Sequence, residues 1–234
     1  MKEPNSTKPD PARPTWKDLR AAESRTYRRI LLDSFLGVFL ANARGLLIDL
    51  GGKKRGRHGS FKPEDFKAVK WININIAMES NPQVAADVCA LPIRDGCTDL
   101  VLCTETLEHL RDPLRCIHES LRILKPGGTL LLSVPFLYPV HADPFDFQRF
   151  TGDGLRAMLQ NFVEVEVRPM GGFWGVVGLF FDLQSSSVRL RILRGFMRRM
   201  GRFLCWVDAW NGNHLSFSIF TTGYFCCAKK AVNG

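Results

Sequence analysis

The chain has 234 residues, of which 45% are hydrophobic and 24% charged, and its mean hydropathy is −0.07. These values exclude a fibrous or a disordered chain, and the length suits one α/β domain with additions rather than two domains. Lysine and arginine outnumber the acids 32 to 23, and the formal charge of +9 favours anionic partners.

The start of the sequence and its cysteines indicate the compartment. Residues 1–15 are polar and rich in proline, without the apolar core of a signal peptide, and predict a flexible tail. The cysteines show no CxxC spacing, and Cys103 and Cys226 lie in apolar runs typical of a core. No apolar run reaches the roughly 18 residues of a spanning helix. We expect a cytoplasmic protein whose membrane contact, if any, is peripheral.

The predicted elements of the first half alternate between helices and strands. Apolar residues at helical spacing between positions 16 and 43 predict one or two lead-in helices. Strands are predicted at GLLIDL, AVKWININI, QVAADV and DLVLCT. A helix that carries LEHL and runs to Lys125, where Pro-Gly-Gly follows, is predicted next, and TLLLSVPF is the fifth strand.

The second half continues the alternation until an insertion interrupts it. Residues 138–150 predict a loop, and a helix follows from Thr-Gly-Asp-Gly to about Leu159. FVEVEVRP is the sixth predicted strand, an insertion occupies about 171–215, and TTGYFCCAKK is the last strand. We therefore predict one Rossmann-like α/β domain over 16–234, with a mostly parallel sheet of about seven strands. The last two strands lack an ordinary crossover helix, so one of them can be antiparallel.

A short acidic and glycine-rich turn follows the first predicted strand. Ligands of open parallel sheets bind beyond the carboxyl ends of the strands, and there Asp49 is followed by Gly51 and Gly52. Glycine lets backbone N–H groups approach a cofactor closely; a plain turn is the alternative. IDLGGKKRG resembles the first motif of class I S-adenosylmethionine methyltransferases, with Lys53 and Arg55 where that family has further glycines.

Other segments resemble the same family in the same order, and the block from DLVLCTETLEHL to LLLSVPF is the strongest match. The resemblance implies a Rossmann-like fold and S-adenosylmethionine as the cofactor. It places Asn73 and Asn75, after the second strand, near the ribose hydroxyls; asparagines facing water are the alternative. Asp87 would lie near the adenine amine with Val88 beside the ring, or else Asp87 caps a helix.

The resemblance extends to the end of the fourth strand and to the loop after the fifth. Thr104 and Glu105 would lie under the methionine or adenosine part of the cofactor. The loop, with its proline, aspartate, aromatic and Arg-Phe-Thr pattern, resembles that of methyltransferases found among polysaccharide and glycolipid biosynthesis proteins. It would therefore meet the acceptor.

Five polar residues of this loop are candidates for chemistry. We expect His141 to accept the proton of an acceptor hydroxyl, with Asp143 or Asp146 orienting it or acting in its place. Tyr138 and Arg149 are predicted to bind the substrate. The alternative is a polar loop that an Asp–Arg pair merely holds together.

One histidine and two basic segments need separate interpretations. His109 in LEHL is interpreted as a structural hydrogen-bonding residue rather than a catalytic one. Lys53 and Arg55 are predicted to bind a phosphate on a nucleotide-linked or lipid-linked sugar, against the alternative of a solvated loop. Residues 188–204 predict a basic amphipathic helix, compatible with an anionic membrane, a cover over the site or a dimer. Packing on its own domain is the favoured interpretation.

The sequence thus predicts an enzyme that transfers a methyl group from S-adenosylmethionine to a small-molecule, sugar or glycan-precursor acceptor, with oxygen as the favoured acceptor atom. No metal is assigned. The competing hypotheses are an inactive methyltransferase-like scaffold and a methyltransferase acting on lipid or nucleic acid, and only the net charge favours nucleic acid. The acceptor and the oligomeric state are left open by the sequence.

Overall fold

The structure is a computed structural model that describes residues 14–21, 25–52, 62–66, 69–142, 144–211 and 219–232. Most of the predicted N-terminal tail, residues 1–13, lies outside this range. The described residues belong to two compact units. A sheet unit is drawn from 43–58, 62–170 and 221–234, and a helical unit is drawn from 1–42, 59–61 and 171–220. The predicted insertion therefore belongs to the same unit as the lead-in helices.

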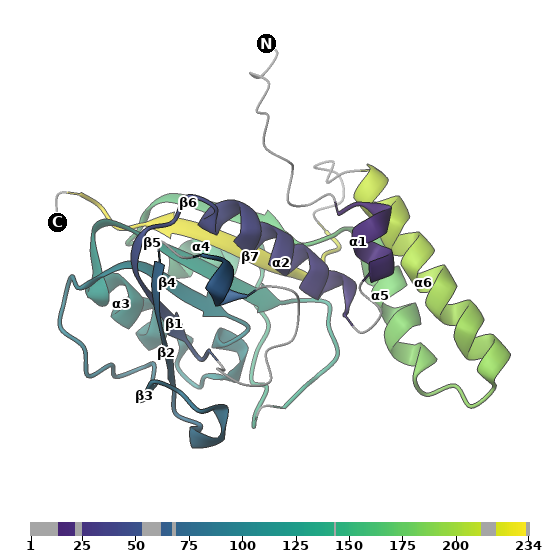
Figure 1. Cartoon of the computed structure of the whole chain (residues 1–234), viewed down its shortest axis with the longest axis horizontal. Helices are drawn as coiled ribbons and strands as arrows, with labels where there is room; N and C mark the ends of the chain where they lie inside the picture. The colour runs from purple at the N-terminus through teal and green to yellow at the C-terminus, as the bar shows by residue number, and fades with distance from the viewer. Residues whose placement is uncertain are drawn as a thin grey trace, which may run out of the picture. The chain divides into compact units, whose positions relative to one another are not determined.

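The described part of the sheet unit is built on a seven-stranded sheet in the order β3-β2-β1-β4-β5-β7-β6 (Figure 1). Neighbouring strands from β3 to β5 are parallel, and β7 runs antiparallel to both β5 and β6. The Rossmann-like prediction is confirmed, including an antiparallel strand among the last two. The strands are β1 (Gly45–Leu50), β2 (Val69–Asn75), β3 (Val84–Ala85), β4 (Thr98–Thr104), β5 (Leu124–Pro135), β6 (Val163–Pro169) and β7 (Gly223–Lys229).

The core of the sheet unit comes from its own residues. The central strands are near-continuous apolar runs, as expected for parallel strands that are covered on both faces. Val101 and Leu132 of the sheet are fully buried and share one apolar cluster with Ile117 and Leu155 of the helices α3 (Pro113–Ile123) and α4 (Gly152–Met158). Short 3-10 turns join the strands at η1 (Pro63–Asp65), η2 (Met78–Ser80) and η3 (Leu107–His109).

The predicted helix from LEHL to Lys125 is wrong at both ends. LEHL forms the 3-10 turn η3, and α3 begins only at Pro113 with Asp112 as its cap, whose Oδ1 atom accepts from the Arg115 N–H at 3.3 Å. A proline has no N–H for a helical bond and disfavours helix at the residue before it, so one continuous helix cannot form. At the other end β5 starts at Leu124 and takes in the Pro-Gly-Gly segment.

The helical unit contains α1 (Trp16–Ala21), α2 (Tyr27–Leu40), α5 (Phe173–Ser185) and α6 (Arg191–Asn211), so the lead-in helices are confirmed. The helices α5 and α6 approach closely at two glycines. A Cβ atom on Gly178 would lie 2.5 Å from the carbonyl oxygen of Gly201, which excludes any larger residue. The Tyr27 hydroxyl also donates to the buried Asp208 carboxylate at 3.0 Å, which links α2 to α6.

None of the helices in the described residues has the length and apolarity needed to cross a membrane.

Candidate active site

The turn after β1 has room for no side chain at either of its glycines. Gly51 has a φ of +76°, and a Cβ atom there would lie 2.4 Å from the Thr106 Oγ1 atom. At Gly52 a Cβ atom would lie 2.3 Å from Oδ2 of Asp49. The Asp49 side chain is buried and accepts a hydrogen bond from Trp71 Nε1 at 3.3 Å. The backbone of the turn thus lies directly over a buried acid, at the carboxyl end of β1.

The two predicted ribose contacts lie inside β2 rather than after it, which corrects their placement. Asn73 is buried and stands opposite Asp49 in the β1–β2 register. Asn75 is the last residue of the strand; its Nδ2 atom donates to the carbonyl of Gly51 at 2.9 Å, and its Oδ1 atom accepts from the Ala77 N–H at 2.9 Å. Asn75 therefore holds the glycine turn in place. Contact of either residue with a ribose stays a prediction.

Asp87 and Val88 follow β3 in the loop that leads to β4. The Asp87 side chain is exposed, and its Oδ1 atom accepts from the Cys89 N–H at 2.8 Å, which is an Asx turn and not a helix cap. Val88 is buried in the core cluster of the sheet unit. The exposed carboxylate remains available for the predicted contact with an adenine amine.

Glu105 has an unusual backbone at the end of β4. It follows Thr104, the last residue of the strand, and has a φ of +53°, a region that side chains other than glycine rarely adopt. Its backbone N–H donates to the Ser133 carbonyl of β5 at 2.9 Å, and its carboxylate accepts from the Ser133 hydroxyl at 2.8 Å. The neighbouring strand therefore stabilises this conformation at a position where the resemblance expects the cofactor.

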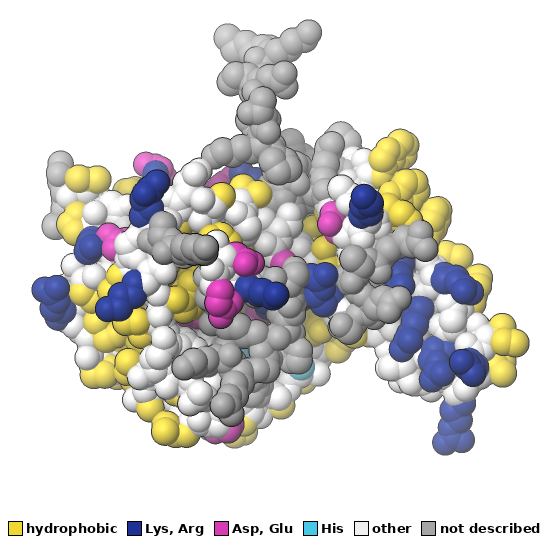
Figure 2. All heavy atoms as spheres, in the orientation of Figure 1, with side chains coloured by type: hydrophobic (Ala, Val, Ile, Leu, Met, Phe, Trp, Pro, Cys, Tyr) yellow, Lys and Arg dark blue, Asp and Glu magenta, His cyan; other side chains and the backbone are white. Residues whose placement is uncertain are grey.

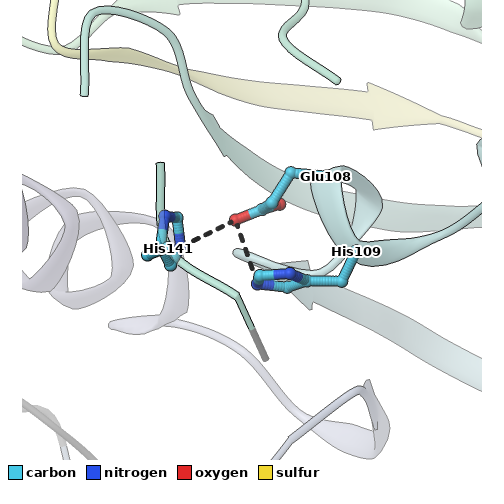
Figure 3. A group of neighbouring side chains, drawn as sticks. All are labelled: Glu108, His109 and His141. Atoms are coloured by element: carbon cyan, nitrogen blue, oxygen red, sulfur yellow. Dashed lines mark ion pairs between the residues drawn. The ribbon is translucent and has the colours of Figure 1, made fainter. Parts of the chain in front are cut away.

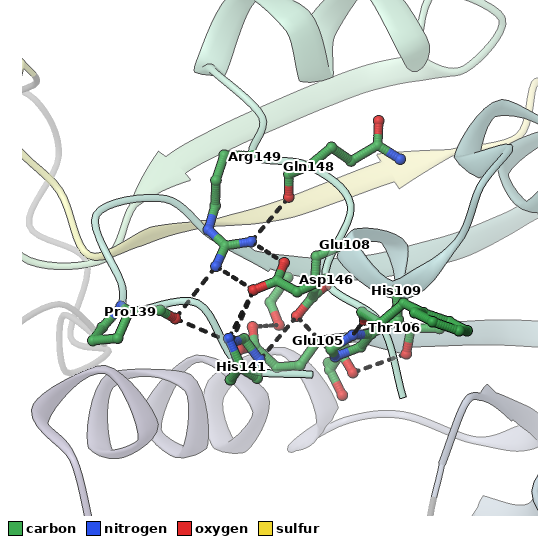
Figure 4. Close-up of polar contacts among 12 residues, drawn as sticks. Glu105, Thr106, Glu108, His109, Pro139, His141, Asp146, Gln148 and Arg149 are labelled. Atoms are coloured by element: carbon green, nitrogen blue, oxygen red, sulfur yellow. Dashed lines mark hydrogen bonds and ion pairs between the residues drawn. The ribbon is translucent and has the colours of Figure 1, made fainter. Parts of the chain in front are cut away.

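The loop after β5 is fastened to η3 by two hydrogen bonds. The Phe147 N–H donates to the Glu108 carbonyl at 2.8 Å, and the His109 Nδ1 atom bonds to the Phe145 carbonyl. The structural hydrogen-bonding role predicted for His109 is confirmed. Because of these bonds, which join residues 36 and 39 positions apart in sequence, the two segments hold their side chains in one place (Figure 4).

Within this loop, Asp146 pairs with Arg149. Both carboxylate oxygens of Asp146 accept from the guanidinium, the Oδ2 atom at 2.7 Å, and the aspartate side chain is only 2% exposed. The hydrogen bonds from Arg149 hold the pKa of Asp146 well below its usual range, despite its burial. Asp146 is therefore a weak base. Its Oδ2 atom also accepts from the His141 N–H at 2.9 Å and lies 3.5 Å from the His141 Nδ1 atom, a geometry that fits the orienting role.

His141, His109 and Glu108 form a compact cluster (Figure 3). The Glu108 Oε1 atom lies 3.8 Å from His109 Nε2 and 3.9 Å from His141 Nε2, and its side chain is fully buried. The Tyr138 ring contacts His141 edge-on, with the ring centroids 5.3 Å apart. Sequence reasoning missed Glu108. The available signal was an acid set between two leucines in LEHL, where a core residue would be expected.

Three predicted site residues lie outside the described part of the chain. They are Lys53, Arg55 and Asp143. Their roles in phosphate binding and catalysis stay predictions.

Comparison with known proteins agrees with the geometry of the sheet unit. Residues 65–132, from η1 to β5, match a family described as methyltransferase domain. A solved structure of a S-adenosylmethionine-dependent methyltransferase from Archaeoglobus fulgidus superposes with a TM-score of 0.56 at 15% identity, covering 86% of this chain and 94% of that one. The chain therefore resembles methyltransferases in the sequence of residues 65–132 and in the fold of its sheet.

Curated proteins with similar sequences match the chain over shorter stretches. A ubiquinone biosynthesis O-methyltransferase of Xanthomonas campestris is 39% identical over 62 residues, which cover 26% of this chain and 23% of that protein. A Mycobacterium tuberculosis protein, named as an S-adenosylmethionine-dependent methyltransferase, is 30% identical over 96 residues, covering 38% of this chain and 35% of its own length. The match thus spans about a quarter to a third of these relatives.

Proposed function

We propose that the methyltransferase domain binds S-adenosylmethionine and transfers its methyl group to a hydroxyl of a small acceptor. The observation that carries the proposal is the glycine turn over buried Asp49 at the carboxyl end of β1, where ligands of such sheets bind. The turn fits this cofactor because its backbone is accessible and no side chain occupies it. The cofactor supplies a methyl group activated by a positively charged sulfur.

The residues beyond β4 and β5 are suited to receive an acceptor. The carboxylate of Glu105 and the buried carboxylate of Glu108 give this edge a negative character that favours a sulfonium over a neutral product. The Nε2 atom of His141 is placed to accept a proton, and the Asp146 carboxylate orients the ring through its backbone N–H and Nδ1 atoms. Positioning of the acceptor oxygen in line with the methyl group supplies the rest of the catalysis.

The acceptor that we propose is a sugar or glycan precursor. The loop of residues 138–150 supports it by its resemblance to loops of polysaccharide and glycolipid methyltransferases. The match to an O-methyltransferase of ubiquinone biosynthesis supports oxygen as the acceptor atom. Lys53 and Arg55 would bind a phosphate if the sugar is carried on a nucleotide or a lipid.

Calorimetric titration tests cofactor binding directly. Wild-type protein and an Asp49→Asn variant are titrated with S-adenosylmethionine and with S-adenosylhomocysteine. We expect micromolar binding by the wild type and a loss of at least about ten-fold in the variant, equal to about 1.4 kcal/mol. Asp153→Asn is the matched control, because its side chain is 98% exposed on α4. Absence of binding by folded wild-type protein would instead support the inactive scaffold.

Transfer of a labelled methyl group tests the acceptor. The panel contains nucleotide-linked sugars, lipid-linked glycan precursors, quinone-type phenols and single-stranded RNA, each with the wild-type protein and the His141→Ala variant. Transfer to a hydroxyl of a glycan precursor, reduced in the variant, supports the proposal. Transfer only to a phenol or to RNA would contradict the acceptor class while leaving the cofactor proposal intact.

A further inference from the structure

The cluster of Glu108, His109 and His141 has the dimensions of a metal site. One ligand atom from each of the three residues lies within 4.8 Å of the other two. Ligand atoms around a tetrahedral zinc ion are about 3.3 Å apart when the bonds are about 2.0–2.1 Å long. Distances of 3.8 and 3.9 Å from the Glu108 oxygen to the two imidazole nitrogens need only a small closure of the side chains.

The hydrogen bonds of the two histidines determine which nitrogen faces the glutamate. A carbonyl oxygen only accepts, so the Nδ1 atom of His109, bonded to the Phe145 carbonyl, must carry the proton. The Nδ1 atom of His141 likewise faces two acceptors, the Pro139 carbonyl at 3.3 Å and Asp146 Oδ2 at 3.5 Å. In a neutral imidazole the Nε2 atom then holds a lone pair, and both Nε2 atoms point toward the carboxylate (Figure 3).

Three electron-rich atoms that converge in this way call for a cation between them. The tautomer is fixed as in known metal sites, where a ligating histidine donates its other N–H to a carbonyl or carboxylate. The glutamate is fully buried, and a buried carboxylate is costly without positive charge beside it. The guanidinium of Arg149 acts electrostatically on Glu108 as well as on Asp146, and a bound cation would add to this stabilisation.

We propose that Glu108, His109 and His141 bind a divalent transition-metal ion, of which zinc and manganese fit the ligand set. Two imidazoles and one carboxylate suit such ions, and three protein ligands leave a position for water or an acceptor oxygen. No metal was predicted from the sequence. His141 lies 32 positions beyond His109, and this separation matches no short spacing that is typical of metal ligands.

The chemical consequence rests on the proposed methyl transfer. A metal ion strongly lowers the pKa of a bound hydroxyl, so an acceptor oxygen at the open position would release its proton to a water molecule before the oxygen attacks the methyl group and displaces the neutral thioether S-adenosylhomocysteine. The Nε2 atom of His141 would then be a metal ligand and not the proton acceptor. The two roles exclude each other, and metal binding decides between them.

A titration with cobalt(II) tests the site without any activity measurement. Tag-free full-length protein is titrated while the visible absorption of bound cobalt is followed. We expect one equivalent to bind, with an affinity at least about ten-fold lower in His141→Ala and in Glu108→Gln. His118→Ala is the matched control, since His118 is exposed on α3 and outside the cluster; it should bind as the wild type does.

Several results would overturn the metal proposal. They are absence of cobalt binding, equal binding by the wild type and His141→Ala, and an intense thiolate-to-cobalt band, which would show that cysteines hold the ion. Circular dichroism and the affinity for S-adenosylhomocysteine are measured on each variant, so that unfolding is recognised. If metal binding fails while S-adenosylhomocysteine still binds, this inference is refuted and the methyltransferase proposal stands.

A second inference concerns the outer face of α6 and depends on different side chains. Four large apolar residues of this helix are exposed by 83, 54, 47 and 73%: Ile192, Phe196, Phe203 and Trp210. Steps of four, seven and seven residues place them on one stripe of a helix. Figure 2 shows yellow side chains along the outer edge of this helix and dark-blue ones gathered near one end.

The charges around the stripe are positive. No acid occurs between Arg189 and Val207, a segment with six arginines. Asp182 of α5 attracts two of them, Arg198 and Arg202. The other arginines give this face of the helix a positive charge that no acid of the segment balances. Near the end of the stripe the Trp206 ring contacts the rings of Phe203 and Trp210.

We infer that this stripe binds an anionic lipid surface. An apolar stripe bordered by arginine, with tryptophan among its exposed residues, is the pattern of a helix that lies in a membrane interface. Charge complementarity selects anionic lipid over a second copy of this basic chain. Packing of α6 on α5 at Gly178 and Gly201 leaves the four stripe residues exposed, while packing of the helix on the sheet stays a prediction.

Vesicle flotation tests the lipid surface. We expect the wild type to float with vesicles containing phosphatidylglycerol and not with pure phosphatidylcholine, and a Phe196→Ser and Trp210→Ser double variant to lose at least about ten-fold in binding. Leu114→Ser is the control, because Leu114 is 43% exposed on α3 of the sheet unit. Equal binding to both vesicles, no binding, or a dimer in sedimentation that the double variant dissociates would overturn the inference.

Discussion

Gly52 shows how one missing side chain shapes the cofactor end of the sheet. In a Gly52→Ala variant the new Cβ atom would lie 2.3 Å from Oδ2 of Asp49, so the acid or the turn must move. We expect the affinity for S-adenosylmethionine to fall at least about ten-fold, or about 1.4 kcal/mol, in calorimetric titration. Gly37→Ala is the control, because Gly37 is exposed in α2 and a Cβ atom there meets nothing within 4 Å. An unchanged affinity in Gly52→Ala would mean that the turn does not position the cofactor.

The Asp146–Arg149 pair should be worth more to the fold than a surface ion pair. Replacement of Arg149 by methionine leaves a carboxylate that is 2% exposed without its guanidinium. Loss of one partner of a buried pair costs on the order of 3 kcal/mol, which urea denaturation measures. An Asp146→Asn and Arg149→Met double variant removes both charges and should recover part of this loss. If the double variant is no more stable than Arg149→Met, the pair contributes little.

At this scale the sequence indicated the chemistry of single residues but not their geometry. Asp49, Gly51 and Gly52 could be recognised because an acid followed by glycines is a local pattern, and the structure places the glycine turn directly over Asp49 of β1. Glu108 could not, since its importance comes from the approach of His141, which the fold and not the sequence spacing produces. The placement of Asn73 after the strand failed because two more residues continue the β2 ladder.

At the scale of elements, Arg122 connects α3 with the loop before β4. Its guanidinium donates to the carbonyls of Leu91 and Ile93 and to the carboxylates of Glu119 and Asp95. The Glu119 carboxylate in turn accepts from the Leu91 N–H at 2.7 Å. The loop that carries the predicted adenine contacts is therefore held against the helix by the side chains of Arg122 and Glu119.

This connection predicts a pH dependence of stability. The hydrogen bond from Arg122 holds the pKa of Glu119 below its ordinary value, so the folded state binds fewer protons than the unfolded chain in this range. The contribution of Glu119 to stability is then present above about pH 4.3, the value for an unperturbed glutamate, and is lost as the pH falls through the lowered pKa. We expect Glu119→Gln to lower the melting temperature at pH 7 by about 4 °C or less, and by a smaller amount at pH 3.5.

The control for this experiment is Arg115→Ala, because Arg115 is 71% exposed and pairs with a half-exposed aspartate on the same helix. It should change the melting temperature little at either pH. If the difference in melting temperature between Glu119→Gln and the wild type grows as the pH falls, Glu119 does not stabilise the fold through its lowered pKa.

The elements themselves could be predicted because each has a local signature. Each of the seven strands overlaps a predicted apolar run, although β4 and β5 begin before theirs, and Thr151 caps α4 as the Thr-Gly-Asp-Gly pattern indicated. The predicted end of α3 was too late. Pro-Gly-Gly shows that no helix continues through it, but it does not show whether the chain has already left the helix and entered a strand, as it has here. The position of β7 between β5 and β6 has no local signature, since only the pairing of distant residues determines it.

At the scale of the whole molecule, the sheet unit should fold without the segment between β6 and β7. The apolar cluster around the sheet contains residues of the sheet unit alone. Met170 and the Thr222–Gly223 segment are hydrogen-bonded to each other, with the Met170 N–H donating to the Gly223 carbonyl at 2.8 Å and its carbonyl accepting from the Thr222 N–H at 3.2 Å. The two ends of the inserted segment are therefore adjacent.

Replacement of residues 172–219 by an Asn-Gly turn tests this independence. The variant lacks α5 and α6 and joins β6 to β7 as a short hairpin. We expect a cooperative thermal transition and retained binding of S-adenosylhomocysteine, together with loss of flotation on anionic vesicles. A variant that does not fold cooperatively would show that the sheet unit needs the helical segment. The division into two units was not apparent from the sequence, because both units share the same apolar composition and the helical unit is assembled from two distant segments.

The adjacency of Met170 and Thr222 gives the inserted segment the character of an interchangeable cassette. The chain leaves the sheet and returns to it at one hydrogen-bonded pair, so a change in the length or composition of the cassette shifts neither the register of β6 and β7 nor the edge of the sheet that carries Asp49 and Glu108. The location of the protein in a cell and its partners there can then diversify while the proposed methyl-transfer chemistry stays constant. Relatives with a matching sheet should differ most in this cassette, in length as well as in charge.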